Sequence, residues 1–196
     1  MFELDFGRGV EAGRYLTELS FFRSVIDKLI ESADPDPDHV TQLADAIKLH
    51  VQPVRATAMT EDWCGDSACN IPILAPFFLS AGVEFAVFHG SDYSELETYY
   101  NDTGDDHIPA VSIWDGNGKE IARWIEQPKQ VLDRKNAWEA ENPSFMEFYR
   151  IRETDRKAAG QFAALYRELM QKMSDWYVDG MWRETTREIV EVVTLS

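Results

Sequence analysis

Residues 63–67, Trp-Cys-Gly-Asp-Ser, place a cysteine where an apolar strand gives way to an apolar helix. Upstream, the run at 51–60 predicts a short buried strand, and downstream the run at 70–80 predicts an apolar helix. A thiolate at such a junction faces the free backbone N–H groups of the helix N-terminus. The turn between strand and helix is therefore predicted to be a functional site.

A second motif follows about forty residues later, where Ile108-Pro109 leads into the apolar run 110–114. The Asp-Gly-Asn-Gly segment at 115–118 is typical of a tight turn, and residues 119–124 supply a return strand. We therefore expect an antiparallel hairpin that begins directly after Pro109.

Together and in this order, the two motifs resemble the thioredoxin superfamily, whose active-site helix opens with W-C-G-P-C and whose cis-proline begins a hairpin. Pro72 matches the helix proline of that family, and Pro109 matches the cis-proline. The resemblance covers roughly residues 50–126 and is greatest to a branch in which the motif reads W-C-G-D-[AS]. It implies an α/β fold with a small mixed sheet of about four strands flanked by helices.

The resemblance also implies the site residues. Cys64 is the expected reactive thiol, and Ser67 occupies the position of the second thioredoxin cysteine, where it could donate to the sulfur or cap the helix. The expected substrate-binding residues are Trp63, Gly65, Asp66, His107, Ile108 and Pro109. Cys69 cannot easily serve as the partner thiol, because five helical residues rise about 7.5 Å and a disulfide needs Cα atoms closer than about 7 Å.

Other positions depart from thioredoxin. The buried aspartate that thioredoxins carry six residues before the nucleophile is Ala58 here, so no proton relay is evident. Carboxylates close to the thiol in sequence or in the implied fold are Glu61, Asp62, Asp66, Asp105 and Asp106. Because like charges disfavour a thiolate, we expect the pKa of Cys64 to be lowered less than in an ordinary thioredoxin. Alternatively, these carboxylates only form a solvated rim.

His107 stands two residues before the expected cis-proline and has two interpretations. As a cation it could stabilise a thiolate, or it could be a loop histidine held by the neighbouring aspartates. The other histidines show no metal-ligand spacing with the cysteines, and the polar loop 101–106 lacks the ligand pattern of an EF-hand. We therefore expect neither a metal nor another cofactor.

Composition narrows the choice of partners and compartment. The chain of 196 residues carries a net charge of −16, which argues against nucleic acid and anionic membranes as partners. No apolar run approaches the roughly 20 residues of a membrane span, and residues 1–5 do not begin a secretory signal. We expect a cytoplasmic protein whose partners are protein or low-molecular-weight thiols and disulfides.

The organisation expected from these patterns is a single thioredoxin-like domain over residues 1–196. Its parts are N-terminal helices at 1–50, a core at 51–126, a helical insertion at 127–182 and a closing helix at 183–196. The apolar spacing predicts one amphipathic helix from Tyr15 to Ile30 and a second over 40–47, in place of the first strand and helix of a full thioredoxin.

The insertion carries a long aromatic-rich helical pattern from 143 to 177, with a break at Gly180. Such a stripe usually indicates ordinary core packing. It could also form one wall of a pocket near Cys64, or a surface for a homodimer.

Three functions follow from these expectations. The first is a monothiol oxidoreductase in which Cys64 forms a mixed disulfide that an external thiol resolves. The second is an adaptor that keeps the fold for protein binding without turnover. The third is a glutaredoxin-like iron–sulfur carrier, because residues 64–67 resemble C-G-x-S. It has the least support, since the glutathione contacts of that family have no match and the acidic rim does not suit glutathione.

Overall fold

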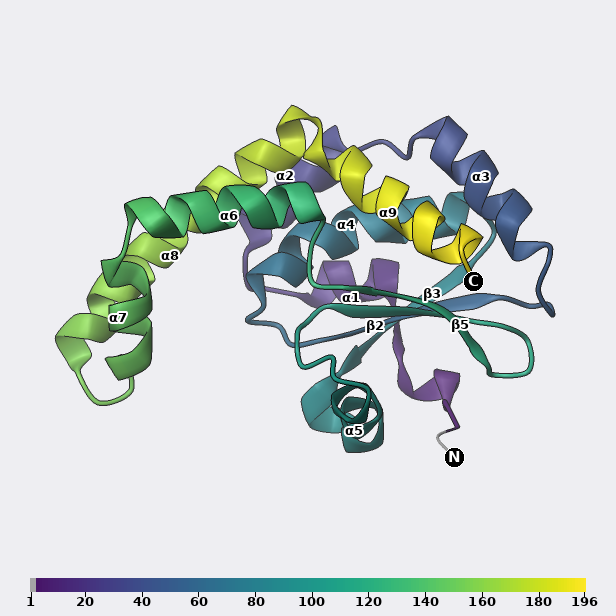
Figure 1. Ribbon diagram of the computed structural model, residues 1–196, viewed down its shortest axis with the longest axis horizontal. Helices are drawn as coiled ribbons and strands as arrows, with labels where there is room; N and C mark the ends of the chain where they lie inside the picture. Colours follow the sequence, from purple (N-terminus) through teal and green to yellow (C-terminus); the bar gives the residue numbers. More distant parts are fainter. Residues whose placement is uncertain (1–2) are drawn as a thin grey trace.

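A five-stranded mixed sheet is the centre of the fold in the computed structural model, which describes residues 3–196 (Figure 1). The strands are β1 (Val10–Glu11), β2 (Arg55–Thr60), β3 (Glu84–His89), β4 (Ala110–Trp114) and β5 (Glu120–Ile125). Their order is β1-β3-β2-β4-β5, with β2 and β3 parallel and every other neighbouring pair antiparallel. The mixed α/β fold expected from the sequence is thus confirmed.

Helices surround this sheet and extend beyond it. The α-helices are α1 (Ala12–Glu18), α2 (Arg23–Ser32), α3 (Pro37–Ile47), α4 (Gly65–Ser80), α5 (Ser94–Asp102), α6 (Lys129–Glu141), α7 (Ser144–Ile151), α8 (Arg156–Trp176) and α9 (Trp182–Thr194). Short helical turns are η1 (Phe6–Arg8), η2 (Gly90–Asp92) and η3 (Tyr177–Met181).

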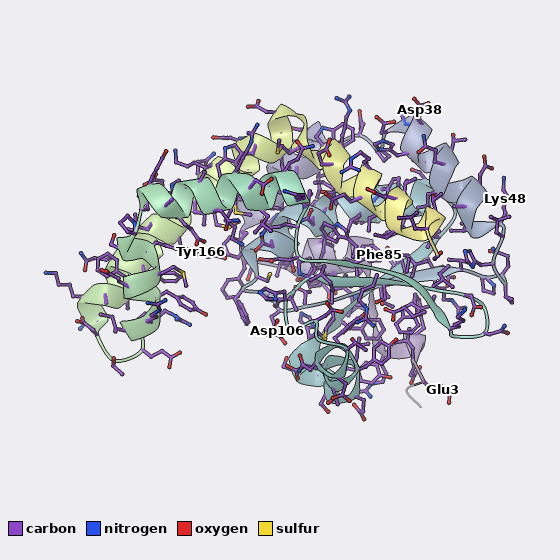
Figure 2. The ribbon with its side chains drawn as sticks, viewed as in Figure 1. Glu3, Asp38, Lys48, Phe85, Asp106 and Tyr166 are labelled. Atoms are coloured by element: carbon purple, nitrogen blue, oxygen red, sulfur yellow. The ribbon has the colours of Figure 1, made fainter. Side chains whose placement is uncertain are left out.

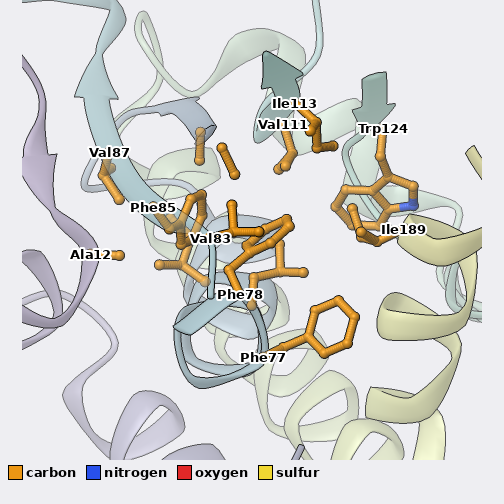
Figure 3. Packing of buried hydrophobic residues seen from close by; sticks show 14 of the residues in the cluster. Ala12, Phe77, Phe78, Val83, Phe85, Val87, Val111, Ile113, Trp124 and Ile189 are labelled. Carbon is orange, nitrogen blue, oxygen red and sulfur yellow. The ribbon is translucent and has the colours of Figure 1, made fainter. Parts of the chain in front are cut away.

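The two faces of the sheet bury alternating residues of the same strands. In β3, Phe85 and Val87 pack with α4 and α9 in the main core, which Figure 3 shows from close by. Ala86 and Phe88 point to the opposite face, where they pack with residues of α5. This alternation follows from the period of two in a strand and explains why β3 is apolar on both faces.

The helices α6, α7 and α8 form an arm that projects from the sheet (Figure 1). The arm joins the rest of the molecule through a second apolar cluster, in which Trp138 of α6 and Met170 and Met173 of α8 pack with Cys69 and Ile73 of α4. The helix that begins beside Cys64 therefore contacts the sheet on one side and the arm on the other.

The N-terminal part differs from expectation. The single helix predicted from Tyr15 to Ile30 is two helices, α1 and α2, and β1 adds a fifth strand to the sheet. The break lies at Phe22, whose φ of 53° is left-handed and cannot continue a helix. This turn lets Tyr15 pack in the main core while Leu29 packs in the second cluster.

The long helical pattern is also interrupted. It divides into α7 and α8, because Asp155 caps α8 by accepting the N–H groups of Lys157 and Ala158. The predicted strand at 51–60 is shorter than expected and begins at Arg55. The break expected at Gly180 is present, with a φ of 113°.

Candidate active site

The junction of β2 and α4 places Cys64 at the N-cap of α4. Its Sγ accepts the backbone N–H of Ser67 at 3.4 Å. The thiol thus takes the place that a serine or aspartate side chain commonly takes at a helix start. Negative charge on the sulfur would be stabilised there by the helix dipole.

The loop before β4 closes over the same sulfur. The Ile108-Pro109 peptide bond is cis, and Cys64 Sγ donates a hydrogen bond to the Ile108 carbonyl at 3.3 Å. The two motifs of the sequence, 44 residues apart, therefore meet at one atom. Pro109 leads directly into β4, so the sheet fixes the position of this carbonyl.

Ser67 lies in the first turn of α4 and is buried. Its hydroxyl accepts a hydrogen bond from Thr60, the last residue of β2. Hydrogen bonds from Ser67, through its side chain and its backbone N–H, lower the pKa of Cys64. The residue that replaces the second thioredoxin cysteine therefore tunes the first one.

Cys64 is less accessible than we expected, with only 6% of its surface exposed. Burial is the largest influence and raises the pKa of the thiol, the hydrogen bonds of Ser67 oppose it, and the Asp66 carboxylate raises it again. The thiol is therefore predominantly protonated at neutral pH. Among the carboxylates expected to raise the pKa of Cys64, Asp66 does so, and its influence is smaller than that of burial and of the Ser67 hydroxyl.

The rim carboxylates have partners of their own. Glu61 accepts the N–H of Ser91, Asp62 pairs with His89, Asp105 pairs with Arg123, and Asp106 pairs with His107. Each of these four carboxylates therefore has a partner other than Cys64. This geometry favours the interpretation of a polar rim over a direct effect on the sulfur.

His107 is exposed, and its Nδ1 lies 2.7 Å from Asp106 Oδ1 (Asp106 is labelled in Figure 2). Its charge also lowers the pKa of the nearby Asp66. This geometry favours a loop histidine over a group that holds the thiolate.

Trp63 is the exposed member of the motif, with 63% of its surface accessible. It stands directly before the buried thiol. A large exposed aromatic ring beside a covered reactive group is suited to contact an incoming molecule.

The site also contains a largely buried ion cluster that the sequence did not predict. Lys135 of α6 lies 3.0 Å from Asp66 Oδ2 and 3.1 Å from Glu126 Oε1. Asp66 and Lys135 expose only 14% and 18% of their side chains. Burial raises the pKa of Asp66 to about 6 although Lys135 opposes this rise. Lys135 is 69 residues from Asp66 in a segment without any motif, so no signal in the sequence pointed to it.

Tyr166 of α8, labelled in Figure 2, is a second unforeseen residue. Its hydroxyl accepts the backbone N–H of Gly65 at 3.2 Å. Its ring stacks on Phe162 at 5.6 Å and meets Phe22 edge-on at 6.1 Å. The arm therefore reaches the first turn of α4 next to the thiol, and the expected pocket near Cys64 stays a prediction.

Asn70 anchors α4 one turn below Asp66. Its amide nitrogen donates to the carbonyls of Asp66 and Glu126, and its oxygen accepts the Thr185 hydroxyl at 2.8 Å. The hydroxyl of Tyr177 bonds to the same side chain. These bonds tie the active-site helix to η3 and α9.

Two structural features bear on other classes of function. Within residues 3–196, no group of three or more histidine, cysteine, aspartate or glutamate side chains is arranged to hold a metal ion. No helix in that part of the chain has the length and apolar character needed to cross a membrane.

Comparisons with known proteins agree with the fold. A family model described as thioredoxin matches residues 29–139, which is more than half of the chain. An HIV epitope-scaffold crystal structure has a TM-score of 0.51 and 20% identity, covering 65% of this chain and 78% of that one. A protein of unknown function from Pseudomonas aeruginosa has a TM-score of 0.51 and 17% identity, covering 89% and 96%. No curated protein matches. By its sequence match and its fold, the chain belongs to the thioredoxin family.

Proposed function

We propose that this protein is a thiol-disulfide oxidoreductase of the monothiol type, from the thioredoxin-like branch with a W-C-G-D-[AS] motif. One observation carries the proposal: Cys64 Sγ lies at the N-terminus of α4 and against the Ile108 carbonyl, with a serine as the third residue after it. A thiol held this way is positioned for exchange, and no second thiol follows it in the first turn.

The reaction has two exchange steps. The Cys64 thiolate attacks one sulfur of a disulfide R–S–S–R′, the S–S bond breaks, Cys64–S–S–R forms, and R′–S⁻ leaves and takes up a proton. An external thiol R″–SH then attacks the mixed disulfide, loses its proton, releases Cys64 and forms R–S–S–R″. The substrate is reduced at R′ and the external thiol is oxidised, so Cys64 ends unchanged.

The surroundings of the thiol favour particular substrates. Trp63, the residue directly before Cys64, is exposed, and the net charge of −16 disfavours anionic disulfides. Protein disulfides or small neutral and cationic disulfides are therefore the preferred class. The Ile108 carbonyl and Pro109 offer backbone to an extended chain, in the manner the family resemblance implies.

Mass spectrometry after treatment with 2-hydroxyethyl disulfide tests the proposal. We expect one adduct on Cys64, its loss in Cys64→Ser, and its release by an added thiol. Cys69→Ala is the matched control, because Cys69 is fully buried and its pKa is raised well above the ordinary value. Wild-type protein that remains free of adduct, or an adduct that no external thiol releases, would contradict the proposal.

The burial of Cys64 favours a second candidate, a binding module that keeps the fold without turnover. A partner of such a module would be bound equally by the wild type and by Cys64→Ser, with and without a reducing agent. A partner of the oxidoreductase would be retained only through Cys64 and released by reduction.

Localisation and assembly are further proposals. We propose a cytoplasmic protein, and fractionation of cells would test this. A homodimer through the arm would use the exposed residues Met146, Tyr149 and Ile151 of α7. The molar mass in solution tests it, since a charge introduced by Ile151→Glu would then separate the protomers.

A further inference from the structure

An open groove with a volume of about 740 Å³ lies between α1, α2, α4 and the first half of β3. Its walls are mainly apolar, with Leu16, Pro76 and Phe85 among them. Two large apolar side chains that line it stay in contact with solvent, since Ile30 exposes 50% and Leu79 77% of its surface. An apolar surface of this kind, bordered by polar side chains, is typical of a binding site.

The charged side chains of the groove give it an acidic character. They are three carboxylates and one guanidinium, those of Glu11, Asp34, Glu84 and Arg23. The charge of Arg23 is already matched by Asp27, its partner one turn further along α2. Glu11 accepts two N–H groups at the start of α1, and Glu84 pairs with Arg55 at 2.8 Å. Asp34 is exposed and has no ion-pair partner within residues 3–196. A ligand of this groove should therefore be apolar and positively charged.

The end of the arm has a surface with those two properties. Figure 1 shows α7 at the end of the arm that lies farthest from the sheet. Met146, Tyr149 and Arg150 share one face of α7, because residues three and four positions apart are neighbours on a helix. All three are exposed, whereas Phe145 on another face packs in the second apolar cluster. The outer face of α7 thus presents two apolar side chains beside a cation.

Further cations surround this face. Residues 144–157 carry four Lys and Arg against three Asp and Glu, in a chain whose net charge is −16. Two of the three carboxylates have local roles, since Asp155 caps α8 and Glu153 lies 3.8 Å from Arg152. The cations that are exposed and have no ion-pair partner in the described part of the chain are Arg150, Arg156 and Lys157. The end of the arm is therefore positive on a molecule that is otherwise strongly negative.

We propose that the outer face of α7 in one copy of this chain binds in the groove of a second copy, and that two copies do so reciprocally. An amphipathic helix in an apolar groove is a common mode of recognition, and the cations of the arm would meet the carboxylates of the groove. Contact between two arms would instead bring cations together, and contact between two grooves would bring carboxylates together. The reciprocal pair is closed, because each copy supplies one α7 and one groove.

This inference extends the proposed homodimer by naming the surface that receives α7, and it does not depend on the chemistry of Cys64. Sedimentation velocity of the full chain tests it. The wild type should form a dimer whose dissociation constant rises with salt, because salt screens the opposite charges. Arg150→Glu and Asp34→Lys each place like charges across the contact and should raise the dissociation constant about tenfold or more. Both positions are exposed, so neither change should disturb the fold.

An equal mixture of the two variants provides the sharpest result. In a mixed pair, the basic arm of the Asp34→Lys chain meets the acidic groove of the Arg150→Glu chain, and the two altered surfaces, now acidic and basic, meet each other. Both contacts are then attractive. We expect the mixture to dimerise about as tightly as the wild type, although each variant alone is weakened. A dimer formed by arms alone would leave Asp34→Lys as tight as the wild type, which would overturn the proposal.

Asp102→Lys is the control for the change in charge, because it lies at an exposed residue of α5 that belongs to neither surface. Its dissociation constant should equal that of the wild type. A wild type that stays monomeric at all concentrations, or a mixture no tighter than its separate components, would also overturn the arm-to-groove contact. The adduct experiment on Cys64 tests the proposed function separately, since neither surface includes that residue.

Discussion

The hydroxyl of Tyr166 accepts the backbone N–H of Gly65 at 3.2 Å, so a side chain of the arm caps the first turn of the active-site helix. These residues are 101 positions apart. The N–H that Tyr166 occupies is one of the free donors that would otherwise face a charge on the helix terminus. The arm is thus part of the electrostatic environment of Cys64.

We expect Tyr166→Phe to destabilise the fold by about 1–2 kcal/mol, because the Gly65 N–H loses its acceptor while the ring packing stays. The freed N–H should favour a thiolate, so alkylation of Cys64 by iodoacetamide should become faster. Urea unfolding and alkylation rates measure the two effects. Tyr149 is an exposed tyrosine whose ring contacts Phe162, as the ring of Tyr166 does, so Tyr149→Phe should change neither the stability nor the alkylation rate. Unchanged stability and reactivity in Tyr166→Phe would refute the capping role.

Gly65→Ala tests how closely the arm covers the thiol. The new Cβ would lie 2.5 Å from the Tyr166 hydroxyl oxygen and still closer to Met170 Sδ. Because the side-chain ends of Met170 and Tyr166 must shift to admit it, we expect a loss of about 1 kcal/mol in unfolding free energy and greater accessibility of Cys64 to iodoacetamide. Gly160→Ala on α8 meets no atom within 4 Å and should instead stabilise the protein by about 0.5–1 kcal/mol. A stable Gly65→Ala with a covered thiol would show that the contact is loose.

The sequence was sufficient for the parts of the fold and site that local patterns encode. A strand, a cysteine and an apolar helix in succession predicted the β2–α4 junction, and Ile108-Pro109 with a following turn predicted the β4–β5 hairpin. Each of these depends on residues that are close in the chain. Period, turn residues and a family motif therefore located them.

What escaped prediction depends on contacts between distant segments. Tyr166 lies on an amphipathic helix whose pattern shows that one face is buried but not which segment it packs against, and Lys135 lies on a helix with little amphipathic pattern. The burial of Cys64, which is the largest influence on its pKa, could not be inferred from the acidic residues beside it, because the groups that meet at this turn, the Ile108 carbonyl and the Tyr166 hydroxyl, are distant in the sequence. The break at Phe22 likewise has no glycine or proline to mark it.

Asn70 should be a sensitive position, because its side chain bonds to two backbone carbonyls and two hydroxyls in the interior. We expect Asn70→Ala to lower the unfolding free energy by roughly 2–4 kcal/mol, since these buried groups lose their partner together. Thr185→Val removes one bond of the set and should cost about 1 kcal/mol. Guanidinium unfolding compares the two variants. Equal and small losses would mean that the network contributes little to holding α4.

The raised pKa of Asp66 predicts how stability depends on pH. Between the ordinary value of 3.8 and about 6, the folded chain binds more protons at this carboxyl than the unfolded chain does. The contribution of Asp66 to stability is therefore most favourable below pH 4, falls as the pH rises, and is lower by roughly 3 kcal/mol above pH 6.

Asp66→Asn lacks this dependence, so its unfolding free energy relative to the wild type should increase by that amount between pH 4 and pH 7. Urea unfolding across this range measures the difference, and Asp62→Asn serves as the comparison at a more exposed carboxylate, two residues before Cys64. A difference between Asp66→Asn and the wild type that stays constant with pH would mean that Asp66 ionises as readily in the folded protein as in the unfolded chain.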